Sequence, residues 1–255
     1  MTTGTRQGVV IKSREEIAIM REAGRIVAEV MQIVLAGVKA GVVVRDLDRV
    51  VRKEYKARGV IPTFLGYHGF PATLCVSVND EIVHGIPGDR VIRDGDVVSI
   101  DMGVTHQGFV GDHAVTVVVG EGDPVANRLV EVTYAALERG IEQARPGNHL
   151  GDIGHAVQAC AEAAGFSVVR EYVGHGVGRA MHEEPQIPNY GEPGRGLKLR
   201  PGMVIAIEPM VNVGDWRTKR HDDGWTVSTV DGGLSAHFEH TIAITDGGPI
   251  VLTVP

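Results

Sequence analysis

The sequence predicts an α+β domain built from two similar halves, about residues 13–120 and 121–255, preceded by an N-terminal extension of residues 1–12. Segments with helical periodicity precede strand-like runs, and this order of two helices and then strands occurs twice. No Pro/Ser-rich linker separates the two halves, so a single domain is favoured over two independent ones.

Helical periodicity dominates residues 13–58 and returns in the second half. Ser13 precedes two glutamates and suits a helix cap, while Gly41 and Gly59 suit helix ends. The expected helices are 13 to about 40, Asp46–Arg58, Val125–Ala144 and Gly151–Ala164. The expected strands are Thr73–Val78, Asp96–Asp101, Phe109–Val119, Met203–Glu208, Trp225–Val230 and His237–Ile244.

Short sequence echoes support an internal duplication. RDGDVVSID (93–101) matches RPGMVIAIE (200–208), which aligns Asp101 with Glu208. Asp112-His113 likewise matches Glu239-His240. Gly41, Asp46-Leu47 and Gly59 recur at the same internal spacing as Gly147, Asp152-Ile153 and Gly165. Three echoes in the same order favour two related halves within one domain.

Composition limits the classes of function. The formal net charge is −7, so the chain shows no basic footprint for nucleic acid or anionic lipid. Its two cysteines, Cys75 and Cys160, exclude a disulfide framework and suit a reducing cytoplasm. The longest apolar stretch, residues 26–38, is too short to span a bilayer. We therefore expect a soluble cytoplasmic protein without a secretory signal.

Two aspartates on neighbouring strands give the strongest local indication of a site. Residues 105–108 suggest a turn, and pairing about His106-Gln107 would place Asp101 directly opposite Asp112. Opposed β-carbons lie about 4.5–5.5 Å apart, so two bare carboxylates there would repel. Either the pair shares a proton or a cation lies between them. The alternative is that both are ordinary turn or edge aspartates.

The internal echo favours a cation, because Glu208 and Glu239 occupy the matching positions of the second half. Glu208 follows the apolar run MVIAI, where a charge without a partner is costly. Four converging carboxylates would need one or two divalent cations. His175, in Gly174-His175-Gly176, is the best candidate for a nitrogen ligand, although a glycine-rich loop with an incidental histidine is the alternative.

Two further histidines are candidates from their local sequence. His182 lies in MHEEP (181–185) and His84 in VHGIP (83–87), and either could equally be a structural histidine. The remaining histidines, including His106, His149, His221 and His237, receive no role.

Seven ordered motifs resemble those of type I methionine aminopeptidases, along nearly the whole chain from about Ser13. The motifs are LGYHGFP (65–71), CVSVNDEIVHGIPG (75–88), DMGVTHQGFVGDHAVT (101–116), GHGVGRAMHEEPQIPNY (174–190), IEPMVN (207–212), DGWTV (223–227) and FEHT (238–241). The resemblance is to the minimal, bacterial-like form. It implies the pita-bread fold, with two pseudo-symmetric halves and a central antiparallel sheet flanked by helices.

The resemblance also implies a dinuclear metal site and residue roles. The metal ligands would be Asp101, Asp112, His175, Glu208 and Glu239. Because Glu208 would lie beside the metal-activated water, we expect it to carry the proton to the leaving amine. His84 and His182 would contact the substrate around the scissile amide. Tyr67, Phe70, Cys75 and Trp225 would line the methionine pocket. Family members often carry Cys at the position of Phe64, Tyr at that of Phe70 and Phe at that of Met181, so this pocket departs from the family pattern.

The resemblance implies removal of the initiator methionine from nascent proteins and peptides by metal-activated water. A mostly hard ligand set suits Mn²⁺ or Fe²⁺, with Co²⁺ or Zn²⁺ as alternatives. A monomer is expected, and contact with the ribosome is left open. The alternatives are a prolidase-like, proline-directed peptidase of the same fold and a non-catalytic binding protein on this scaffold.

Overall fold

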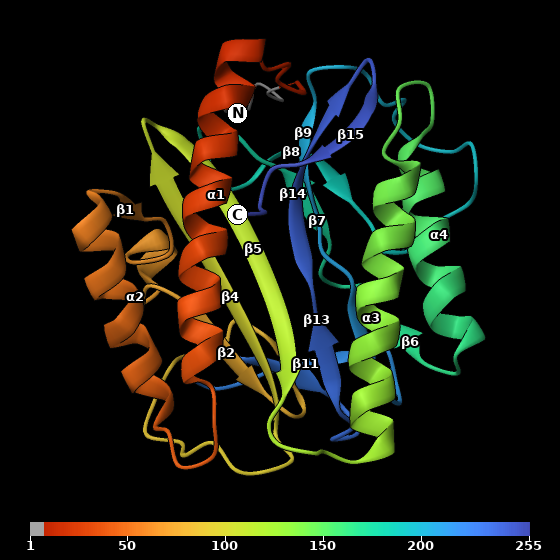
Figure 1. Cartoon of the computed structure of the whole chain (residues 1–255). Helices are drawn as coiled ribbons and strands as arrows, with labels where there is room; N and C mark the ends of the chain where they lie inside the picture. Colours follow the sequence, from red (N-terminus) through yellow and green to blue (C-terminus); the bar gives the residue numbers. More distant parts are fainter. Residues whose placement is uncertain (1–7) are drawn as a thin grey trace, which may run out of the picture.

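Helices cover one face of an antiparallel sheet (Figure 1). A computed structural model describes residues 8–255, so residues 1–7 of the expected N-terminal extension lie outside the described residues. The helices are α1 (Arg14–Gly37), α2 (Val44–Arg58), α3 (Pro124–Gln143) and α4 (Leu150–Ala163), and a 3-10 helix spans Tyr67–Gly69. Over the described range, no helix is both long and apolar enough to cross a membrane.

The main sheet has nine strands in the order β1-β4-β5-β14-β9-β7-β8, with β2 also paired to β4 and β15 to β14. These strands are β1 (Ile61–Pro62), β2 (Cys75–Val78), β4 (Val97–His106), β5 (Phe109–Val118), β7 (Gly174–Gly176), β8 (Glu183–Ile187), β9 (Val204–Ile207), β14 (Glu239–Thr245) and β15 (Gly248–Val251). Two three-stranded sheets are formed by β6 (Ser167–Val168), β10 (Met210–Asn212) and β13 (Ser235–His237), and by β3 (Glu81–Val83), β11 (Thr218–Arg220) and β12 (Val227–Thr229).

The predicted α+β fold with two pseudo-symmetric halves is confirmed, and backbone hydrogen bonds repeat between the halves. Gly41 N–H donates to Ile92 at 2.9 Å, and its counterpart Gly147 donates to Leu199 at 3.1 Å. Each bond ties the segment before a helix, α2 or α4, to the segment before a strand of the main sheet, β4 or β9. The sequence echoes therefore correspond to equivalent places in the fold.

The halves meet where β5 pairs with β14. His113 lies directly opposite His240, and their rings stack with centroids 4.7 Å apart. Antiparallel pairing of two equivalent strands is what a local twofold axis produces. Because side chains alternate along a strand, Asp112 and Glu239 both point to the face opposite these histidines. The duplication thus delivers one carboxylate from each half to the same face.

The β4–β5 hairpin corrects one prediction. His106 pairs with Phe109 and Asp101 pairs with Ala114, so the expectation that Asp101 lies directly opposite Asp112 is wrong. The turn is Gln107-Gly108, whose φ angles of 48° and 78° suit a two-residue hairpin turn. The register differs by two residues from the predicted one, so both aspartates still share a face and lie diagonally.

Several element boundaries also differ from the predictions. The cap at Ser13 is confirmed, since its hydroxyl accepts from Glu16 N–H and Glu16 caps in return. The first helix ends at Gly37 rather than Gly41, which lies in a turn at φ 89°. The predicted strand His237–Ile244 is wrong as one strand, because the chain changes sheet at Phe238.

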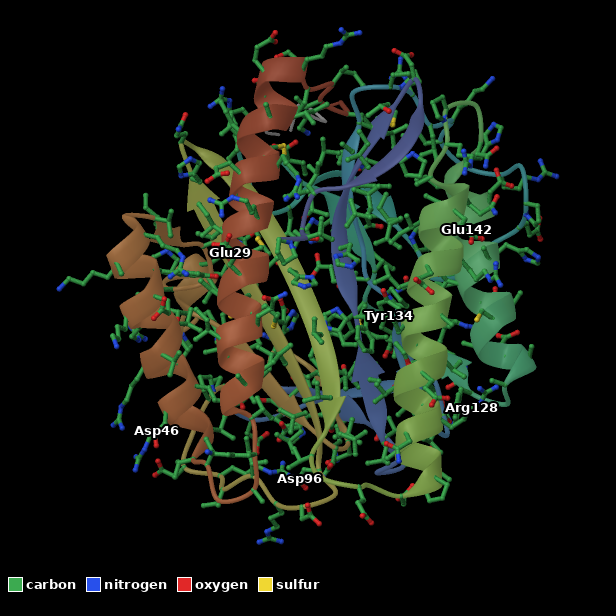
Figure 2. All side chains as sticks on the ribbon, in the orientation of Figure 1. Glu29, Asp46, Asp96, Arg128, Tyr134 and Glu142 are labelled. Atoms are coloured by element: carbon green, nitrogen blue, oxygen red, sulfur yellow. The ribbon has the colours of Figure 1, made fainter. Side chains whose placement is uncertain are left out.

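Helix α1 packs across β4 and β5 with its apolar face inward. Val27, Val30 and Met31 are buried there against Ile100 and Met102. Charged residues lie on the outward side of the helices, and Figure 2 shows Arg128 and Glu142 along α3 in this position. The helices leave the other face of the sheet uncovered, and the candidate functional site lies on that face.

One glycine in α1 permits close packing of the C-terminal segment. A Cβ on Gly24 would overlap the carbonyl oxygen of Leu252, whereas one on Gly37 would lie 3.7 Å from Leu47. Gly24→Ala is therefore expected to lower the free energy of unfolding by about 1–3 kcal/mol. The matched control Gly37→Ala should be neutral or raise it by about 0.5 kcal/mol. Urea unfolding of both variants measures this, and equal effects would contradict the packing described.

Candidate functional site

One cavity of about 260 Å³ on the helix-free face of the sheet brings all the candidate residues together. Its lining includes the five expected metal ligands, both expected substrate histidines and the four expected pocket residues: Asp101, Asp112, His175, Glu208, Glu239, His84, His182, Tyr67, Phe70, Cys75 and Trp225. Phe64, His68 and Met181 complete the lining. These residues are therefore neighbours in the structure as it stands.

Strands of both halves position the acidic end of this cavity. Asp101 and Asp112 come from β4 and β5, while Glu239 begins β14 and Glu208 directly follows β9. His175 is the central residue of β7, between two glycines. A Cβ at Gly176 would overlap the backbone of Glu184, so glycine allows β8 to approach His175 closely.

The imidazole of His175 is oriented as a ligand would be. Its Nδ1 lies 2.9 Å from the carbonyl oxygen of Gly176, and since a carbonyl only accepts, Nδ1 must donate. The lone pair of Nε2 then points at the carboxylates, 3.6 Å from Asp112 Oδ2 and 3.5 Å from Glu208 Oε1. Burial lowers the pKa of His175 to about 3, so the ring is neutral and fit to bind a cation.

Three of the carboxylates fit a divalent cation because one oxygen of each lacks a hydrogen-bond partner among the described residues. Asp101 Oδ1, Asp112 Oδ1 and Glu239 Oε1 are buried without a hydrogen-bond partner. One donor atom from each of Asp112, His175 and Glu239 lies within 4.8 Å of the others. A buried carboxylate oxygen without a donor is costly, and a cation among these atoms would satisfy several at once.

Burial and mutual repulsion both disfavour the charged forms of these acids. Burial raises the pKa of Asp112 well above its usual range, and the charge of Glu208 adds to this. Burial likewise raises the pKa of Glu239, with Asp112 as the next cause, and raises the pKa of Glu208 to about 8. A bound cation is what would restore the charged forms.

The other end of the cavity is apolar. Phe70 and Trp225 meet edge to face with ring centroids 5.1 Å apart, and Phe64 lies edge-on to Phe70 at 6.5 Å. Cys75 and Met181 are buried beside them. An unbranched apolar side chain would be surrounded there by aromatic and sulfur-containing groups.

His84 is held at the cavity in an uncommon backbone conformation. Its φ of 62° lies in the left-handed region, which non-glycine residues seldom adopt and which the surrounding structure must hold in place. Gly85, the next residue, donates to Ser77 Oγ at 3.2 Å and could not accept a Cβ, which would overlap Val76 O. Burial, followed by neighbouring His237, lowers the pKa of His84 to about 4, which keeps the ring neutral.

His182 reaches the cavity from the loop between β7 and β8. Its Nδ1 lies 2.7 Å from the hydroxyl of Tyr67, and its ring centroid lies 4.3 Å from that of His175. Burial lowers the pKa of His182. The ring is therefore neutral and held at Nδ1 by Tyr67.

Two histidines to which the sequence assigned no role also lie at this site. His68 lines the cavity, and His237 Nε2 lies buried 3.7 Å from Glu208 Oε2 with no hydrogen-bond partner. The spacing of His237 from Glu239 indicates this position. His237 and Glu239 are two residues apart, so alternation along the predicted strand would place them on one face, although the chain changes sheet between them at Phe238.

The class of protein follows from a match of residues 18–246 to the model of metallopeptidase family M24. The chain therefore belongs to metallopeptidase family M24. Among its relatives is methionine aminopeptidase 1 of Bacillus subtilis, which is 51% identical over 245 residues, or 96% of this chain and 99% of that protein. The resemblance to bacterial-type methionine aminopeptidases is thereby confirmed.

Solved structures agree with this assignment. The crystal structure of methionine aminopeptidase from Thermotoga maritima superimposes with a TM-score of 0.96 at 48% identity, covering 97% of this chain and 100% of that one. Prolidase from Pyrococcus furiosus superimposes with a TM-score of 0.78 at 26% identity. The superposition covers 96% of this chain and 66% of the prolidase chain. The predicted pita-bread fold is confirmed by both.

Proposed function

We propose that this enzyme removes the N-terminal methionine from proteins and peptides. The observation that carries the proposal is the cavity itself, where unpaired buried carboxylates and a ligand-oriented His175 lie next to an apolar pocket. Full-length similarity to proteins named methionine aminopeptidase supports the same activity. Nascent chains and short peptides with a free N-terminal methionine are the proposed substrates.

Two divalent ions are proposed as the cofactors, held by Asp101, Asp112, His175, Glu208 and Glu239. When bound, such ions supply Lewis acidity and lower the pKa of water enough for hydrolysis near neutral pH. Four carboxylates and one imidazole favour Mn²⁺ or Fe²⁺ over a softer ion, and Co²⁺ or Zn²⁺ also fit the donor set.

The chain's own residues orient the substrate and move its protons. The methionine side chain enters the apolar end between Phe70, Cys75 and Trp225, and the free α-amine docks among the carboxylates. This arrangement accepts only a chain end, because an internal residue has no free amine to offer. Glu208 takes the proton of the attacking water and passes it to the leaving amine.

The two cavity histidines act at the scissile amide. When the hydroxyl of Tyr67 donates to Nδ1 of His182, the ring carries its proton on Nε2. That N–H donates to the amide oxygen as negative charge develops there. His84, kept neutral by burial, contacts the amide from the side of Trp225, whose ring centroid lies 6.4 Å away.

The setting of this activity is also proposed. We place the enzyme in the cytoplasm, where it would encounter newly made proteins. Its two free cysteines are stable in that reducing compartment. The enzyme is proposed to act as a monomer. Contact with the ribosome is a separate question that pull-down on translating ribosomes would answer.

A peptide-release assay on metal-stripped protein tests the proposal. Methionine is expected from a Met-Ala peptide after a divalent ion is added back, and little or none before. An Ala-Pro peptide is the matched substrate for a proline-directed enzyme of this fold. Faster release from Ala-Pro would favour that alternative, and no ion binding with no release would favour a non-catalytic protein.

A further inference from the structure

A buried ion pair lies beneath the loop that carries His182. Lys12 Nζ is 2.6 Å from Glu183 Oε2, and only 2% and 13% of the two side chains are exposed. The partners are 171 positions apart, so the pair ties the segment before α1 to the first residue of β8, directly after the loop that carries His182. Buried charges are retained where they are paired and fully hydrogen-bonded.

The second oxygen of Glu183 folds the loop back on itself. Its Oε1 accepts from the backbone N–H groups of Arg179 at 2.9 Å and Ala180 at 3.2 Å. Met181 and His182 lie between these donors and Glu183 in the sequence, so the carboxylate closes a short ring of chain around them. With Lys12 on the other oxygen, both oxygens of Glu183 have strong donors.

The loop backbone rests directly on this pair. A Cβ at Gly178 would lie 2.5 Å from Glu183 Oε1 and 2.6 Å from Lys12 Cε, so any larger residue there would displace the pair. Gly178 also accepts from Val110 N–H at 2.8 Å, which ties the loop to β5. Lys12 is itself anchored, because its N–H donates to Gly202 at 2.8 Å.

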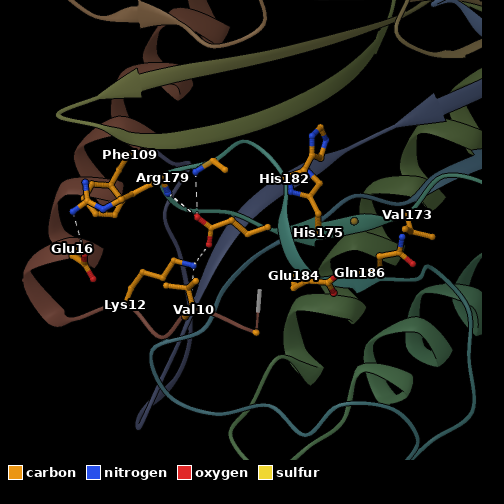
Figure 3. A pocket seen from close by; sticks show the side chains of 14 residues that line it. Val10, Lys12, Glu16, Phe109, Val173, His175, Arg179, His182, Glu184 and Gln186 are labelled. Atoms are coloured by element: carbon orange, nitrogen blue, oxygen red, sulfur yellow. Dashed lines mark hydrogen bonds and ion pairs between the residues drawn. The ribbon is translucent and has the colours of Figure 1, made fainter. Parts of the chain in front are cut away.

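A second cavity of about 930 Å³ shares His175 and His182 with the site and is bordered by this pair. Figure 3 shows Lys12 and Val10 on one side of it and Val173 on the other, with the loop bearing His182 above. The Lys12–Glu183 pair thus lies in the wall of a cavity that reaches the proposed catalytic residues.

We propose that Lys12 and Glu183 form a latch that positions His182, an inference that rests on the proposed function. Glu183 fixes the main chain beside His182, while Tyr67 fixes its ring from the other side. Both latch residues are positioning residues that act through His182. Loss of either frees the loop and moves the imidazole away from the amide it serves.

Lys12→Met and Glu183→Gln test the latch, since each removes one charge and keeps most of the side-chain volume. Each is expected to lower kcat for a Met-Ala peptide roughly 10–100-fold, as loss of a residue that orients a site commonly does. KM and divalent-ion affinity should stay unchanged. Glu184→Gln is the matched control: it makes the same substitution at the next, exposed residue and should leave kcat unaltered.

The same substitutions in a His182→Ala background separate positioning from a general structural role. A latch that acts through His182 predicts less than about twofold further loss there, because interacting residues are not additive. If kcat falls by the same factor in the wild-type and the His182→Ala backgrounds, the proposal is overturned. Thermal unfolding identifies a variant that has simply lost its fold, and Glu183→Gln, which keeps an acceptor for the loop, is the milder of the two.

A measurement that does not depend on enzymatic activity distinguishes failure of the latch from failure of the proposed function. In NMR spectra of metal-free protein, the imidazole signals of His182 should shift or broaden in Lys12→Met, and those of His155 should not. Unchanged His182 signals overturn the latch. Wild-type protein that releases no methionine overturns the proposed function instead, and the NMR comparison still decides the latch.

Discussion

Replacing His175 by alanine is expected to abolish methionine release, with kcat/KM falling by more than about 100-fold. This loss of activity is larger than that expected for a residue that only supports a metal ligand. His175 Nε2 faces both Asp112 and Glu208, at 3.6 and 3.5 Å. Alanine leaves nothing to take its place, so both ion retention and water activation suffer. Peptide release and calorimetric ion titration measure the two losses.

The control for this substitution is His155→Ala. His155 is an exposed histidine of α4, away from the cavity, and its loss should change neither ion affinity nor methionine release. His182→Ala adds a second comparison, because it should lower kcat while leaving ion affinity intact. Full activity of His175→Ala with the ion concentration controlled would contradict the site assignment.

Asp112→Asn is expected to raise stability while destroying activity. In metal-free protein, Asp112 is fully buried, faces the charge of Glu208, and has an oxygen without a partner. A neutral amide of the same shape removes that penalty, so the free energy of unfolding should rise by about 1–3 kcal/mol in the absence of metal. Methionine release should fall as far as in His175→Ala.

Adding a divalent ion should reverse the order of stability. A ligand that binds only the folded state stabilises it in proportion to its affinity. Wild-type protein should therefore gain more from the ion than Asp112→Asn, whose donor set is weakened. Asp246→Asn is the matched control, since Asp246 is exposed on the turn before β15. If metal-free Asp112→Asn were less stable than metal-free wild type, the carboxylates would not repel as described.

The duplication was the part of the fold that the sequence predicted best. Echoes such as Asp112-His113 with Glu239-His240 depend only on local similarity, and the structure places these histidines opposite each other on paired strands. The convergence of four carboxylates follows from that duplication and the alternation of strand side chains. The roles of Tyr67 and Cys75 came only from family resemblance, because nothing local marks a pocket residue.

The hairpin register was not predicted correctly, although its signal was present. Gly108 favours the second position of a two-residue turn, which selects Gln107-Gly108 over His106-Gln107. His237 was given no role, although the predicted strand His237–Ile244 already placed it on the face of Glu239. The pairing of Lys12 with Glu183 joins residues 171 positions apart, and no local pattern specifies such a contact.

The most direct test is a titration of metal-stripped enzyme with one divalent ion, following bound ion and methionine release from Met-Ala together. We predict that release is negligible without ion and rises as the cavity fills, up to two ions per chain. Full release from ion-free protein, or ion bound equally well by His175→Ala, would contradict a metal centre built by the carboxylates of both halves.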